Sequence, residues 1–262
     1  MNKFNLKGKN ALITGGTGWL GFEFCKLLAE NNANIILATR DLKKGEEIAE
    51  KLKKLFDLNN QIIYIIELDM NNPQSTIDSK FNELEDKFGK IDILINNAYK
   101  LIDKDIYTIN LEEFNLYQNQ NGFNFYLSKL VRDLAVKNNL SSSIVNIGSM
   151  YGSVSSYPDV YEGLNNSSSI AYHTLKGGLI NMTKHMAVYW AKDKIRVNCL
   201  SPGAFPKKTI DFNFKKKLEE KIPLNRIGEP HELTGALLLL ISDAGSYITG
   251  HNLVVDGGWT IQ

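Results

Sequence analysis

Seven short apolar runs, separated by segments of helical periodicity, constrain the fold of this chain more than any other feature. The runs are continuous rather than alternating, as is typical of strands buried on both faces of a sheet. Between them, apolar residues recur at helical spacing, as in Ile48, Leu52 and Leu55. This alternation predicts an α/β fold with a doubly wound, mainly parallel sheet and helices on both faces. The expected strands are residues 11–13, 35–38, 62–66, 91–95, 144–147, 195–200 and 253–255.

The composition excludes several classes of partner. Thirty basic and 29 acidic side chains leave a formal net charge of +1, which gives no field to recruit nucleic acid or an anionic membrane. The N-terminal segment is polar, and the longest apolar run, Ala236–Ile241, is far too short to span a bilayer. We therefore expect a cytoplasmic protein. Because the chain contains no Pro/Gly/Ser-rich linker and no repeat, we expect one domain over residues 1–262.

The cysteine and histidine residues give no sign of a metal site. Cys25 and Cys199 each lie in an apolar segment, and neither belongs to a CxxC or metal-ligand pattern. The four histidines do not cluster at ligand spacing. We expect buried free thiols, a reducing compartment and no metal.

A glycine-rich turn, TGGTGWLG over residues 14–21, directly follows the first expected strand and opens a helix. Such a turn brings backbone N–H groups against a pyrophosphate at the positive end of a helix dipole. A merely tight turn could contain the same glycines, but the strand–turn–helix context favours a dinucleotide site. The residues expected to form it are Gly15, Thr17, Gly18, Trp19, Leu20 and Gly21.

The end of the second expected strand indicates which dinucleotide binds. An acidic residue there selects the free 2′-hydroxyl of NAD, whereas Arg accommodates the 2′-phosphate of NADP. Thr39 and Arg40 stand at this position, so NADP(H) is preferred and NAD(H) is possible. Arg40 could instead pair with Asp41. After the third strand, Asp69 and its neighbour Met70 could touch the adenine, or Asp69 could cap the next helix.

Tyr172 and Lys176, four residues apart in a segment of helical periodicity, form the candidate acid/base pair. Residues at this spacing share a helix face, so an ammonium can lie near the phenol. A charge a few ångströms away can supply roughly the 4 kcal/mol needed to bring a tyrosine pKa toward neutrality. Ser149, at the end of the fifth strand, could bond a substrate oxygen. Asn119 could hold a water behind Lys176, or be an ordinary exposed helix residue.

With these residues in place, the whole chain resembles the classical short-chain dehydrogenase/reductase family, which has a Rossmann-type fold. Together the matching motifs are highly specific. They are Thr14-Gly15, Asn96-Asn97-Ala98, Ser149, Tyr172 with Lys176, Arg196-Val197-Asn198 leading to Pro202-Gly203, Ile248-Thr249-Gly250, and Val255-Asp256-Gly257-Gly258.

The resemblance implies a role for each residue of the site. Tyr172 is the general acid in carbonyl reduction and the base in alcohol oxidation. Lys176 lowers the pKa of Tyr172 and bonds the nicotinamide ribose, Ser149 polarises the carbonyl, and Asn119 completes a proton relay through water. The cofactor would also be bordered by Asn96, Asn97, Ala98, Pro202 and Gly203. Family members are usually tetramers, which implies a homo-oligomer, a tetramer or a dimer.

The chain departs from the family pattern at three places. Trp19 stands where classical members have a glycine, as in the extended subgroup of sugar-nucleotide enzymes, although the chain ends as classical members do. Tyr99 replaces the glycine that usually follows Asn-Asn-Ala. The gap from Ser149 to Tyr172 is long and contains Tyr161-Glu162-Gly163. A similar insertion occurs in reductases encoded with bacterial flagellin or lipopolysaccharide modification pathways.

These observations predict an oxidoreductase that interconverts a ketone and a secondary alcohol on a polar, sugar-like small molecule. Two substrate loops are expected, at residues 151–169 and 203–222, and they would contribute Tyr151, Tyr161 and Phe205 beside Ser149 and Tyr172. A 3-ketoacyl carrier or thioester reductase is an alternative, supported weakly by Lys207, Lys208 and residues 215–217. A dinucleotide-binding scaffold or redox sensor is the non-enzyme alternative.

Overall fold

One seven-stranded parallel sheet forms the centre of the molecule in a computed structural model that describes residues 2–58, 61–102, 104–164 and 167–262. The strand order is β3-β2-β1-β4-β5-β6-β7, and every neighbouring pair is parallel. All seven expected strands are confirmed. They are β1 (Asn10–Thr14), β2 (Asn34–Thr39), β3 (Ile63–Glu67), β4 (Ile93–Asn96), β5 (Ser142–Ile147), β6 (Ile195–Pro202) and β7 (Asn252–Val255).

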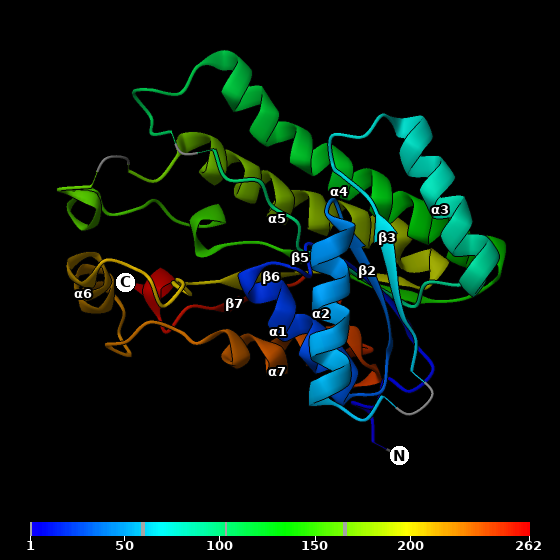
Figure 1. The fold of residues 1–262 in the computed structure, drawn as a ribbon. Helices are drawn as coiled ribbons and strands as arrows, with labels where there is room; N and C mark the ends of the chain where they lie inside the picture. Colours follow the sequence, from blue (N-terminus) through cyan, green and yellow to red (C-terminus); the bar gives the residue numbers. More distant parts are fainter. Residues whose placement is uncertain (1, 59–60, 103, 165–166) are drawn as a thin grey trace.

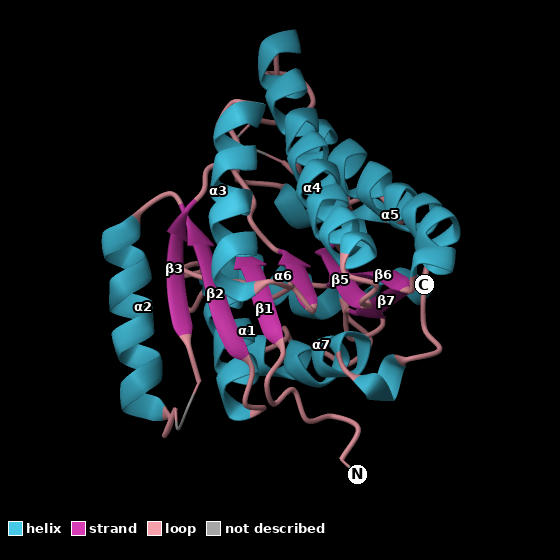
Figure 2. Cartoon of the chain, turned by 90° about the vertical axis from the view of Figure 1, so that its right-hand side faces the viewer, coloured by secondary structure: helices cyan, strands magenta, loops and turns pink. Residues whose placement is uncertain are grey.

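The helices cover both faces of the sheet, as Figures 1 and 2 show. On one face lie α1 (Trp19–Glu30), α2 (Leu42–Leu55) and α7 (Thr234–Ile241). On the other lie α3 (Gln74–Phe88), α4 (Leu111–Lys137) and α5 (Ile170–Trp190). The shorter α6 (Phe212–Lys221) packs beside the loop that follows β5.

Alternation along the strands explains how one sheet supports two hydrophobic cores. In β1, Ile13 packs into the core under α1 and α7, whereas Leu12 packs into the core under α3, α4 and α5. Both side chains are fully buried, so a strand in the middle of this sheet needs apolar residues on both of its faces. Only the edge strands β3 and β7 are mostly half-buried.

Local signals fix where several helices begin and end. Asp41 accepts a hydrogen bond from the Lys44 amide and caps α2. Asn110 and Glu113 form a reciprocal capping box at the start of α4. Helix α3 ends at Gly89, whose φ of 66° lies in the left-handed region that favours glycine.

A buried polar network joins the middle of the sheet to α4 and α5. The Asn96 amide donates to the Asn146 side chain at 2.8 Å and to the Ser128 hydroxyl at 2.9 Å. The Asn146 amide donates in turn to the Thr183 hydroxyl at 2.9 Å. This network lies directly below the ends of β4 and β5, and so it fixes the strand ends that carry the site.

Cys25 and Cys199 are free and buried, as expected. Within the described ranges, no group of three or more His, Cys, Asp or Glu side chains could hold a metal ion. None of the helices in that part of the chain is both long and apolar enough to cross a membrane.

Candidate active site

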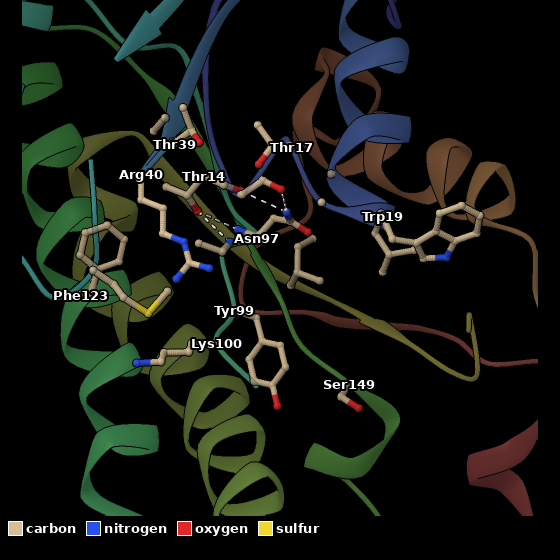
Figure 3. A pocket seen from close by; sticks show the side chains of 18 of the residues that line it. Thr14, Thr17, Trp19, Thr39, Arg40, Asn97, Tyr99, Lys100, Phe123 and Ser149 are labelled. Carbon is tan, nitrogen blue, oxygen red and sulfur yellow. Dashed lines mark hydrogen bonds between the residues drawn. The ribbon is translucent and has the colours of Figure 1, made fainter. Parts of the chain in front are cut away.

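A cleft of about 450 Å³ opens at the carboxyl ends of the parallel strands (Figure 3). This is where ligands bind in open α/β sheets, at the point where strand order reverses. Here β1 and β4 are neighbours and their connections leave in opposite directions. Every residue predicted from the sequence to border the cofactor lines this cleft, except Asn96, which is buried in the polar network beneath it.

The glycine turn between β1 and α1 forms a cradle that leaves no room for side chains. Gly15 has a φ of 66°, and a Cβ there would lie 2.8 Å from the Ala98 Cα. The Asn97 amide donates to the carbonyls of Thr14 and Gly15 at 3.1 and 2.9 Å, which ties the turn to β4. The cradle and the N-terminus of α1 beside it fit the pyrophosphate of a dinucleotide.

The end of β2 leaves Arg40 available to a ligand. Asp41 caps α2 and pairs with the Lys44 ammonium at 3.6 Å, so the alternative pairing of Asp41 with Arg40 is wrong. Thr39 is buried, and its hydroxyl accepts from the Asp41 amide at 3.1 Å. Figure 3 shows the exposed Arg40 side chain extending into the cleft on the side of Phe123.

Asp69 lines the cleft but does not cap the following helix. Its carboxylate accepts from the backbone and side-chain amides of Asn71, both at 2.8 Å. The N-cap of α3 is Pro73, so the capping alternative is wrong. Asp69 shapes the turn after β3 instead, next to Met70 in the cleft wall.

Ser149, Tyr172 and Lys176 come together at the inner end of the cleft. Ser149 and Lys176 are 6 and 7 % exposed. The Ser149 hydroxyl lies close enough to the Tyr172 phenol to lower the pKa of that group. The Lys176 Nζ donates to the Ile147 carbonyl at 2.7 Å and lies 5.7 Å from the centroid of the Tyr172 ring. The four-residue spacing therefore places the pair on one helix face, as expected.

Burial controls the protonation of this pair. It raises the pKa of Tyr172 to about 12, while the nearby Ser149 hydroxyl acts in the opposite direction. Burial also lowers the pKa of Lys176 to about 8. The pKa of Tyr172 is therefore raised in this structure, not lowered as expected, because the loss of water around the phenol outweighs the other influences on it.

Asn119 does not lie in the cleft, and its expected place behind Lys176 is wrong. It is exposed on the far side of α4, beside Asn115 and Leu116. The inward residues are Gln120, which bonds both backbone groups of Lys100, and Asn121, whose amide donates to the Leu175 carbonyl at 2.9 Å. The sequence could have indicated which residues of α4 point inward. At helical spacing one face carries Tyr117, Gln120, Asn121 and Asn124.

The predicted substrate residues divide between two cavities. Ser149, Tyr172 and Phe205 line the cleft. Tyr151 and Tyr161 instead line a neighbouring cavity of about 930 Å³ formed mainly by the loop after β5. Their hydroxyls bond each other at 2.8 Å, and the Tyr151 ring stacks on His173 at 4.7 Å. Part of that loop, residues 165–166, lies outside the described residues.

Comparison with known proteins decides the family. A sequence model described as "Enoyl-(Acyl carrier protein) reductase" matches residues 18–260. A D-arabinitol 2-dehydrogenase (ribulose-forming) of Scheffersomyces stipitis is 32% identical, over 98% of this chain and 95% of its own. The crystal structure of a short-chain type dehydrogenase/reductase from Mycobacterium marinum superposes with a TM-score of 0.87 at 31% identity, covering 100% and 98% of the two chains. The chain belongs to the short-chain dehydrogenase/reductase family.

A further relative is an NADP-dependent mannitol dehydrogenase of Hypocrea jecorina, 31% identical over 100% of this chain and 96% of that protein. As a short-chain dehydrogenase/reductase, the protein is an oxidoreductase that interconverts a ketone and a secondary alcohol with a nicotinamide dinucleotide. The glycine cradle and the cleft fit such a cofactor, which supplies or accepts the hydride when bound.

Lys100 and Phe123 also line the cleft of this short-chain dehydrogenase/reductase, and sequence reasoning missed both. Phe123 lies in α4, where the helical repeat makes it look like one more core residue. Lys100 lies just after the Asn-Asn-Ala motif, in a segment that is neither helix nor strand. Such a segment has no repeat of apolar residues from which the direction of a side chain could be predicted. Both positions depend on how α4 lies across the end of β4.

Proposed function

We propose that this protein is an NADP(H)-preferring oxidoreductase of polyhydroxylated, sugar-like alcohols and ketones. The observation that carries the proposal is the meeting of Ser149, Tyr172 and Lys176 at the inner end of a glycine-cradled cleft. The names of the relatives support the substrate class, since they act on arabinitol and mannitol.

In this proposal Tyr172 moves the proton. During reduction its phenol gives a proton to the carbonyl oxygen, and during oxidation the phenolate takes the proton of the alcohol. Ser149 donates to the same oxygen and so polarises the carbonyl. Lys176 stabilises the phenolate by its charge and would bond the nicotinamide ribose.

The proton that leaves Tyr172 needs a route to solvent, and α4 offers Asn121 for this rather than Asn119. Among the described residues, the Asn121 Oδ1 is buried without a hydrogen-bond partner, while its amide bonds the Leu175 carbonyl next to Lys176. We assign it to hold a water in the proton relay.

Arg40 supports the preference for NADP(H). Its guanidinium is left unpaired by Asp41 and extends into the cleft at the end of β2, where a 2′-phosphate would lie. The name of the mannitol dehydrogenase supports the same cofactor. An NADH affinity equal to or above that for NADPH would contradict this assignment.

The thioester-reductase alternative loses support from the lysines of α6. Lys217 donates to the carbonyls of Asp159 and Glu162 at 3.1 and 2.8 Å, and Lys215 pairs with Glu219 at 3.5 Å. Lys217 thus holds the loop after β5 and Lys215 is paired within its own helix, so both are less available to an acidic carrier protein.

The deciding experiment measures NADPH and NADH oxidation with a panel of ketoses and with an acetoacetyl thioester. We expect turnover of ketoses with NADPH, and a loss of at least about a thousandfold in Tyr172→Phe with cofactor binding retained. Turnover of the thioester alone would favour the carrier reductase. Cofactor binding without any hydride transfer, unchanged by Tyr172→Phe, would favour the scaffold or sensor.

We further propose that the protein acts as one catalytic domain in a cytoplasmic homo-oligomer. Exposed apolar side chains on α4 and α5, including Phe125, Val188 and Tyr189, support association through these helices. Light scattering after size exclusion should give twice or four times the 29.5 kDa chain mass; a monomer at micromolar concentration would contradict it.

A further inference from the structure

Tyr99 lies against the acid/base pair. In the cleft, the Tyr99 ring meets the Tyr172 ring edge-on, with centroids 5.2 Å apart and planes at 61°. The Lys176 Nζ lies 5.4 Å from the centroid of the Tyr99 ring. Figure 3 shows the Tyr99 side chain extending into the part of the cleft that also contains Ser149. A glycine would leave this side of the ammonium open.

The surrounding structure holds the Tyr99 ring in place. Its hydroxyl lies 3.2 Å from the hydroxyl of Tyr117, which is fully buried. The Tyr117 hydroxyl already donates to the Ile102 carbonyl at 2.7 Å and accepts from the Ile102 amide at 3.0 Å. Tyr99 is therefore the donor of the hydroxyl pair, and the ring is anchored to both α4 and the segment after β4.

The Lys176 ammonium has few other groups to stabilise its charge. It donates to the Ile147 carbonyl of β5 and lies over the Tyr172 ring of α5, and the Cys199 thiol of β6 acts on its pKa only as a more distant charge. Ser149 acts on the phenol of that ring and lowers its pKa. Two aromatic faces within 6 Å thus replace the water that burial removes, and an aromatic face attracts a cation most strongly where water is excluded.

We propose that Tyr99 is a positioning residue that holds the Lys176 ammonium charged and beside the Tyr172 ring. This inference rests on the acid/base roles given to the pair in the proposed function. Tyr99 acts through Lys176 and needs no contact with the substrate to do so.

A direct test reads the charge of Lys176 without any substrate. The full-length chain carries lysine labelled with ¹³C at Cε, and the resonance of Lys176 is assigned by its loss in Lys176→Met. We expect Tyr99→Leu to lower the pKa of Lys176 by about half to one unit, whereas Tyr99→Phe, which keeps the ring, leaves it in place. A pKa that is unchanged or raised in Tyr99→Leu overturns the proposal.

Kinetics give the second readout. In the oxidation direction, the acidic limb of the pH profile of kcat/KM should move to higher pH in Tyr99→Leu, because a less charged Lys176 stabilises the phenolate less. Tyr99→Phe should keep the profile of the wild type. A uniform loss of rate without a shift would indicate a merely structural role. If the wild type turns over no polyol, the proposed function fails, while the titration still decides the role of Tyr99.

Discussion

Lys176 shows the conflict between function and stability at the scale of one residue. Its ammonium is 7 % exposed and bonds one neutral carbonyl, that of Ile147. Taking a charge out of water without a full counter-charge disfavours the folded state. This loss of folding stability accompanies the function proposed for Lys176, which is to place a positive charge near the phenol of Tyr172.

The pH dependence of stability follows from the lowered pKa of Lys176. Below about pH 8 the ammonium is charged in both the folded and the unfolded chain, so the burial cost is present in full. As pH rises from about 8 to 10.5, the folded state loses its proton first and the cost disappears. The free energy of unfolding should therefore rise over this window relative to a variant without the charge.

We accordingly expect Lys176→Met to stabilise the protein at pH 7 by up to about 3 kcal/mol while abolishing activity. Urea unfolding of both proteins at pH 7 and pH 10 measures the difference, which should shrink at the higher pH. The matched control is Lys184→Met on the exposed side of the same helix. Lower stability of Lys176→Met at pH 7 would show that burial of the charge is well compensated.

At the scale of elements, the cleft depends on segments that are far apart in the sequence. The start of α1 and the segment after β6 are joined by one hydrogen bond, from the Trp19 indole to the Phe205 carbonyl at 3.2 Å. Both residues line the cleft. The glycine pattern alone showed Trp19 only as a departure from the family, because its partner follows a strand nearly two hundred residues later.

We expect Trp19→Phe to weaken NADPH binding by about two- to tenfold, since a net hydrogen bond contributes about 0.5–1.5 kcal/mol. The variant keeps an aromatic ring but releases the segment that contains Phe205. Isothermal titration calorimetry measures the affinity without relying on tryptophan fluorescence. Trp190→Phe, at the end of α5, should leave the affinity unchanged; equal affinities in all three proteins would remove this role of Trp19.

At the scale of the whole molecule, the buried polar network links the sheet to the helix layer formed by α4 and α5. Asn146 is fully buried, accepts from Asn96 and donates to Thr183. A change there removes one hydrogen bond from each neighbour, although the Asn96 amide keeps the Ser128 hydroxyl and the Thr183 hydroxyl keeps the Leu179 carbonyl. That loss acts on β4, β5 and α5 together, and therefore on the base of the cleft.

We expect Asn146→Leu to lower the free energy of unfolding by about 2–4 kcal/mol, because the amide of Asn96 and the hydroxyl of Thr183 both lose a partner. Calorimetry should show a Tm lower by roughly 5–15 °C for a chain of this size. The exposed Asn181→Leu serves as the control on α5. A Tm within 2 °C of the wild type would mean that the network relaxes without cost.

The sequence by itself determined the fold class, the seven strands, the cofactor turn and the Ser149, Tyr172 and Lys176 set. These are local signals, since apolar runs, glycine turns and a four-residue spacing act over a few neighbouring residues. Tertiary structure alone decided that Asn119 faces outward, because the orientation of α4 depends on its packing. It likewise placed Tyr151 and Tyr161 in a separate cavity and Tyr99 over Lys176. Contacts between segments distant in sequence set these positions, and no local pattern encodes them.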